Sequence, residues 1–142
     1  MKKILKVSVL LICVFLITGC FGTKKLTCTN KMDSETNKTT VKYVFTYKKD
    51  KLVRIQNDVV GSFNDKKLAK SSGEDAEEYY SKMDDVDGIT AKVKVSGKKV
   101  TAKLDMKFEK MSKKDIENAG YNNLPTYAEA KEEMEEDGFT CR

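Results

Sequence analysis

The clearest pattern in this chain is a strict alternation of apolar and polar residues over two adjacent segments, 89–95 and 100–108. The apolar positions are Ile89, Ala91, Val93 and Val95 in the first segment, and Val100, Ala102, Leu104, Met106 and Phe108 in the second. Such alternation is typical of a strand with one face on a core and the other in water. Because the turn residues Ser96-Gly97-Lys98-Lys99 separate the segments, the pattern predicts a β-hairpin.

Three more segments near the N-terminal half predict strands. Residues 41–47 are rich in branched and aromatic side chains, which favour strands. Residues 52–60 follow a polar turn and predict the second strand of another hairpin. Residues 26–32 predict a strand before them, and residues 139–142 predict a short strand at the end of the chain.

Helical spacing appears in three places. Apolar residues of segment 74–86 recur at offsets of 0, 3, 4 and 7, which places Ala76, Tyr79, Tyr80 and Met83 on one helix face. Either Ser71 with Glu74 or Ser72 with Asp75 could form its capping box, and residues 61–73 fit a loop or a lead into this helix. Two further capping patterns, Ser112 with Asp115 and Thr126 with Glu129, predict short helices over 112–119 and 126–137.

This order of elements predicts an α+β fold rather than an α/β fold, since the strands come in antiparallel pairs. We expect an antiparallel sheet of four or more strands built from two hairpins and packed by one main amphipathic helix. C-terminal helices and a short final strand complete it.

The first nineteen residues differ from the rest. Three lysines, at positions 2, 3 and 6, precede an apolar run over residues 7–17. This run is too short to span a bilayer, which takes about 20 residues, and it fits an export signal. The segment ends in Ile17-Thr18-Gly19-Cys20, which resembles the lipobox of bacterial lipoproteins.

That resemblance implies removal of a signal peptide, residues 1–19, and attachment of a diacylglycerol to Cys20. Two acyl chains give stable anchoring. The chain would then lie on the extracytoplasmic face of the cell membrane, with residues 20–25 as a short tether and residues 26–142 as one domain. The alternative is an anchored or secreted protein in which Cys20 is an ordinary thiol.

Cysteine usage agrees with export. Of four cysteines, Cys13 lies in the predicted signal and Cys20 takes the predicted lipid, which leaves Cys28 and Cys141. An oxidising compartment permits a disulfide between them, and it would join the two ends of the domain. The alternative is two free buried thiols. Two thiolates without histidine fall short of the four ligands of a zinc site, so we expect no metal and no cofactor.

Charge excludes one class of partner. The chain has 27 basic and 22 acidic residues, a net charge of +5, but without the three signal lysines the net charge is +2. This near balance gives no electrostatic support for binding nucleic acid. Six lysines of the 89–108 hairpin could contact an anionic surface, or simply keep a sheet face soluble: Lys92, Lys94, Lys98, Lys99, Lys103 and Lys107.

Candidate chemistry is sparse. The chain has no histidine, so Ser–His and Cys–His nucleophiles are excluded. The acidic stretch 84–88 does not fit an EF-hand loop, because Met83 and Lys94 would stand at ligand positions. The six tyrosines could line a ligand groove, although we expect half or more of them to belong to the core: Tyr43, Tyr47, Tyr79, Tyr80, Tyr121 and Tyr127.

The mature segment also resembles the YehR-like small bacterial lipoproteins, through residues 45–52, the helix with Tyr79 and Tyr80, and the hairpin ending in Lys107 and Phe108. The resemblance implies a small membrane-anchored α+β domain and carries over no active residues. We therefore expect a monomeric binding or interaction module of the cell envelope, with an envelope partner still to be identified, rather than an enzyme. The alternatives are an inhibitor or modulator of an exported enzyme and, less favoured, an envelope enzyme.

Overall fold

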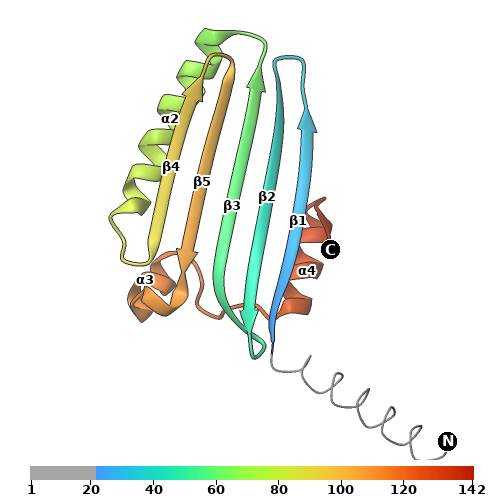
Figure 1. The fold of residues 1–142 in the computed structure, drawn as a ribbon, viewed down its shortest axis with the longest axis vertical. Coiled ribbons are helices and arrows are strands. Elements are labelled where there is room, and N and C mark those ends of the chain that lie inside the picture. The colour runs from blue at the N-terminus through green and yellow to red at the C-terminus, as the bar shows by residue number, and fades with distance from the viewer. Residues whose placement is uncertain (1–21) are drawn as a thin grey trace, which may run out of the picture.

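A computed structural model describes residues 22–142 of the chain; the predicted signal peptide and Cys20 lie outside these residues. Its six strands form one antiparallel sheet in the order β4-β5-β3-β2-β1-β6 (Figure 1). The strands are β1 (Thr23–Asp33), β2 (Asn37–Lys48), β3 (Lys51–Phe63), β4 (Ile89–Ser96), β5 (Lys99–Lys107) and β6 (Thr140–Cys141). The predicted α+β class, with two hairpins and a short final strand, is confirmed.

Both predicted hairpins close through tight two-residue turns. Lys49 and Asp50 join β2 to β3 with positive φ angles of 48° and 60°. Positive φ at both central residues is the mark of a type I′ turn, whose twist matches that of the strands it joins. Gly97 supplies a φ of 62° in the turn between β4 and β5.

The main helix, α2 (Lys66–Asp84), begins eight residues before the predicted start at residue 74. Asp65 is its N-cap, and its carboxylate accepts hydrogen bonds from the backbone N–H groups of Lys67 and Leu68. The predicted caps at Ser71 and Ser72 are therefore wrong. Small residues explain the difference: Ala69 and Gly73 are the buried residues of α2, so its first turns contact the sheet without large apolar side chains.

The C-terminal helices begin at the predicted caps. In α3 (Lys113–Asn118) the Ser112 side chain accepts a hydrogen bond from the backbone N–H of Asp115. In α4 (Tyr127–Glu136) Thr126 and Glu129 form a complete capping box. The starts of both helices match the sequence prediction, because these caps are local interactions between residues three positions apart. A single turn of 3-10 helix, η2 (Phe108–Lys110), connects β5 to α3.

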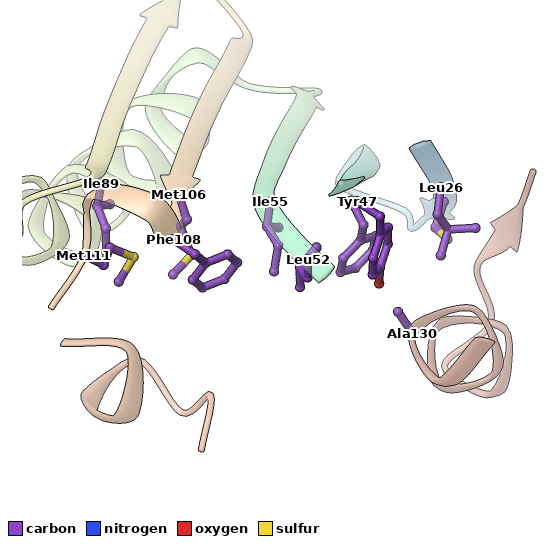
Figure 2. Close-up of a cluster of buried hydrophobic side chains, with 11 residues drawn as sticks. Leu26, Tyr47, Leu52, Ile55, Ile89, Met106, Phe108, Met111 and Ala130 are labelled. Atoms are coloured by element: carbon purple, nitrogen blue, oxygen red, sulfur yellow. The ribbon is translucent and has the colours of Figure 1, made fainter. Parts of the chain in front are cut away.

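The core lies on one face of the sheet, the face that α2 and α4 cover (Figure 1). Figure 2 shows its side chains in a row across the strands, from Ile89 on β4 through Ile55 on β3 to Leu26 on β1, with Ala130 of α4 below. Tyr47 is the largest fully buried side chain, and its hydroxyl donates a hydrogen bond to the carbonyl oxygen of Thr126 at 3.2 Å. The core thus joins the sheet to the C-terminal helix.

A disulfide joins Cys28 on β1 to Cys141 on β6, as predicted. The two cysteines are direct partners in the ladder between these strands. Backbone hydrogen bonds of 2.9 Å run both ways between Thr27 and Arg142, next to the bridge. The last residues of the chain are therefore fixed beside the first strand.

The N-terminal boundary of the folded part lies earlier than predicted. β1 begins at Thr23, so Lys24 and Lys25, which the sequence analysis placed in the tether, are strand residues. Lys24 forms an ion pair with Asp50 of the β2–β3 turn, at 3.1 Å. Within residues 22–142, no helix has the length and apolar character that crossing a membrane requires.

Candidate functional site

A cleft of about 380 Å³ lies on the helix-covered face of the sheet, between α2 and α3. Strands β2, β3, β4 and β5 supply its floor, which includes Ile55, Leu104 and Met106. Met83 of α2 and Ala119 at the end of α3 line its walls. A concave, mainly apolar site of this size is typical of pockets for small ligands.

Asn57 is the polar residue in the cleft floor. Its side chain is buried, with 4% of its surface exposed, at a position of β3 that faces the core. It donates a long hydrogen bond to the carbonyl oxygen of Lys42 and accepts one from the hydroxyl of Tyr80, both at 3.4 Å. These distances exceed the usual range of about 2.7–3.2 Å, so the amide is weakly bound by the protein itself.

Tyrosines surround this amide. Tyr43 lies directly opposite Asn57 in the ladder between β2 and β3, and Tyr79 and Tyr121 also line the cleft. Burial raises the pKa of Tyr43, and the nearby Tyr79 raises it further. Burial likewise raises the pKa of Tyr121, with smaller contributions from Tyr43 and Glu133. At neutral pH these phenols are therefore protonated and can donate hydrogen bonds.

Charged groups stand at the edge of the cleft. Lys82 lines it and forms an exposed ion pair with Glu78, at 3.2 Å. Asp115 lines the opposite wall, where its backbone N–H and the hydroxyl of Ser112 form the cap of α3. Among the residues that the structure describes, no group of three or more acidic or cysteine side chains is arranged to hold a metal ion.

The apolar floor of the cleft can enclose an apolar group, and Asn57 with the tyrosines can hydrogen-bond a polar one.

The tyrosines are distributed between the cleft lining and the packed core. Tyr43, Tyr79 and Tyr121 line the cleft. Tyr47 and Tyr127 instead contact each other edge to face, with ring centroids 5.6 Å apart. Burial, followed by the effects of Tyr127 and Glu129, raises the pKa of Tyr47 to about 12. Asn57 was not predicted from the sequence, although a polar residue between Ile55 and Val59 at a core-facing position was a usable signal.

The six lysines of the second hairpin lie away from the cleft. Strand alternation and register place five of them on the face of the sheet opposite the core: Lys92, Lys94, Lys99, Lys103 and Lys107. Lys98 lies in the turn, where its carbonyl oxygen accepts a hydrogen bond from the backbone of Phe63. The structure thus brings most of the predicted contact residues onto one surface.

Two solved structures share this fold. The NMR structure of the YehR protein of Escherichia coli superimposes with a TM-score of 0.59 and 18% sequence identity, over 84% of this chain and 92% of that one. The NMR structure of a protein from Streptococcus pneumoniae TIGR4 gives a TM-score of 0.55 and 14% identity, over 85% and 86% of the two chains.

No protein-family model and no curated protein matches the chain. The two superpositions show a shared fold. At sequence identities below 20% they show no more than that, because a fold alone does not specify a function.

Proposed function

We propose that the mature chain is a lipid-anchored binding module of the cell envelope that encloses a small, largely apolar ligand in the cleft between α2 and α3. The cleft carries this proposal. Its floor combines apolar side chains with Asn57, a buried amide whose hydrogen bonds within the protein are long. A ligand with an apolar body and one or two polar groups would bury the former and hydrogen-bond the latter.

The proposal includes the anchor at Cys20 and distant membership of the YehR-like lipoproteins. The lipobox pattern of residues 17–20 supports the anchor, and the likeness to the E. coli YehR structure over most of both chains supports the kinship. We propose that the protein is a monomer on the extracytoplasmic face of the membrane and that it binds rather than catalyses.

An inhibitor or modulator of an exported enzyme remains the alternative. Such a protein would insert a loop into an enzyme cleft, but the two hairpin turns are polar, over residues 48–51 and 96–99. The cleft gives the ligand-binding proposal the more specific support.

The cleft is tested with Nile red, a neutral apolar dye whose fluorescence rises in apolar surroundings. A neutral dye is needed because an anionic one would also bind lysines. We expect saturable binding to the wild-type chain and loss of binding in Ala119→Trp, which puts an indole into the cleft from an exposed position. Ala128→Trp, on an exposed position of α4, is the matched control and should bind as wild type. Equal binding by both variants would contradict the proposal.

The anchor is tested in cells. Cys20→Ala should leave the protein unprocessed or release it from the membrane fraction, because the attachment atom is missing. Unchanged incorporation of labelled fatty acid into this variant would rule the lipid anchor out. This result and the dye result are independent, so either part of the proposal can fail alone.

A further inference from the structure

Within residues 22–142, no helix lies over the face of the sheet opposite the core. Helices α2 and α4 both lie on the core side, and the other face is open across β4, β5, β3, β2 and β1 (Figure 1). The side chains on this open face follow from alternation and register, since Lys25, Lys42 and Arg54 lie at positions opposite in parity to the buried Leu26, Phe45 and Ile55. We call this surface the basic face.

Its charge is concentrated. Three acidic residues lie on it: Asp33, Asp58 and Asp105. Twelve basic residues lie on it: Lys25, Lys31, Lys38, Lys42, Lys48, Lys51, Arg54, Lys92, Lys94, Lys99, Lys103 and Lys107. Twelve against three is an excess of nine positive charges. Residues 22–142 contain 24 basic and 22 acidic residues, so the rest of the domain carries 12 against 19, an excess of seven negative charges.

The three acidic residues are already neutralised. Asp105 accepts two hydrogen bonds from Arg54, at 2.6 and 2.7 Å. Asp58 pairs with Lys103 at 3.9 Å, and Asp33 pairs with Lys38 at 3.2 Å. No ion pair within residues 22–142 involves the remaining lysines Lys25, Lys31, Lys42, Lys51, Lys92, Lys94 and Lys99. These seven side chains are exposed and available to an external anion.

Like charges also face one another across strands. Lys92 is directly opposite Lys103, Arg54 is opposite Lys107, and Lys48 is opposite Lys51. Like charges in such positions destabilise a sheet. Natural sequences retain such unfavourable arrangements mainly at functional sites, so the basic face is suited to a partner rather than to stability.

We propose that the basic face lies against the anionic phospholipid headgroups of the membrane. A face without helices brings many lysines to one plane at once, and long lysine side chains adapt to headgroup phosphates. The acidic remainder of the domain is repelled by the same surface, which fixes the orientation. β1 begins at Thr23, three residues after the proposed anchor, so the face is held within reach of the membrane. The cleft, on the opposite face of the sheet, then opens away from the lipid.

The test uses the chain from residue 20 with Cys20→Ser, which retains the whole core and both disulfide cysteines, all within residues 26–141. Co-sedimentation with vesicles of phosphatidylglycerol and phosphatidylcholine is compared with vesicles of phosphatidylcholine alone. We expect binding only to the anionic vesicles and its loss as salt is raised, because salt shortens the Debye length. The variant Lys42→Glu, Lys92→Glu, Lys94→Glu should bind at least about 100-fold more weakly.

A matched control separates the face from net charge. The variant Lys66→Glu, Lys67→Glu, Lys114→Glu makes the same charge change on α2 and α3, at lysines without ion pairs within residues 22–142, and should bind nearly as wild type. Lys92→Glu alone should unfold at no lower urea concentration than wild type, because the new carboxylate would face Lys103 across the strands. The proposal would be overturned if both triple variants lost vesicle binding equally, or if the wild-type chain bound neutral vesicles as well as anionic ones. Binding to purified anionic wall polymer but not to vesicles would also overturn it.

Discussion

Gly73 sets the distance between α2 and the sheet. A Cβ atom at this position would lie 2.1 Å from Cγ2 of Val95 on β4, closer than any real carbon contact. The contact atom belongs to a branched side chain that is stiff about χ1, so an added Cβ would force Val95 to shift. Gly73 is therefore required by packing, although glycine is among the poorest helix formers.

We predict that Gly73→Ala destabilises the domain. Alanine should gain about 1 kcal/mol of helix propensity, but overpacking of this kind costs about 1–3 kcal/mol. Urea unfolding measures the difference. Val95→Ala leaves the nearest remaining atoms 3.6 and 3.9 Å from the new Cβ, so the double variant should be more stable than Gly73→Ala alone. A Gly73→Ala variant more stable than wild type would contradict the close approach.

Asp105 gives the stability of the sheet a dependence on pH. Its hydrogen bonds with Arg54 hold its pKa below the ordinary value of 3.8, burial opposes this, and the charges of Arg54 and Lys107 add to it. A carboxylate with a lowered pKa in the folded state stabilises fully above its unfolded pKa, and this stabilisation disappears as pH falls through the folded pKa.

We therefore predict that Asp105→Asn lowers the free energy of unfolding by about 1 kcal/mol at pH 7, a modest value because both side chains are partly exposed to solvent. The difference from wild type should begin to shrink below about pH 4. Urea unfolding of both proteins between pH 7 and about pH 2.5 measures it. A difference that is constant across this range would show that the carboxylate charge is not responsible.

At the scale of single residues, the sequence predicted the caps of α3 and α4 and the Cys28–Cys141 bridge correctly, the cap of α2 wrongly and the cleft poorly. Ser112 and Thr126 each accept a hydrogen bond from the backbone N–H three residues later, so the local sequence is enough to predict their roles. The cleft instead depends on Asn57 meeting Tyr43 and Tyr121, from segments far apart in the chain. Their meeting is decided by tertiary packing, which no local pattern reports.

At the scale of elements, alternation identified the strands because a period of two is distinct from helical spacing. The start of α2 was missed because residues 66–73 lack large apolar side chains on the buried face, so the apolar stripe is incomplete there. The first strand also extends beyond its apolar core to Lys24 and Lys25. Strand ends of this kind are set by pairing with a neighbour, here β2, rather than by their own residues.

We expect the final strand, β6, to depend on the disulfide. It has two residues, Thr140 and Cys141, and pairs with β1 alone. Replacing Cys28 and Cys141 together by serine should lower the free energy of unfolding by about 2–5 kcal/mol, because the bridge closes a long loop in the unfolded chain. Urea unfolding with and without a reductant measures this. The reductant should destabilise wild type to about the level of the double variant and leave that variant unchanged.

At the scale of the molecule, the charge of the domain is divided between two faces, which composition conceals. The net charge of +2 over residues 22–142 arises from one strongly positive face and an acidic remainder. The sequence identified the hairpin lysines on β4 and β5. Lys25, Lys31 and Lys42 join them only because the order β4-β5-β3-β2-β1 places their strands in the same sheet. Strand order is a long-range property, so the full surface required the structure.

The position of the disulfide also has a mechanical consequence. A tensile load applied between residue 20 and Arg142 enters the fold at Thr23 and runs along β1 to Cys28, where the S–S bond passes it to Cys141. The load can strip residues 23–27 from β2, but the bond carries it past the rest of the sheet. In an optical trap, the oxidised chain should lengthen only by its few residues outside the bridge. Reduction should release the 113 residue steps between the cysteines, up to about 370–410 Å. A domain tethered at one end and pulled at the other would thus remain folded under forces that unravel an unbridged sheet.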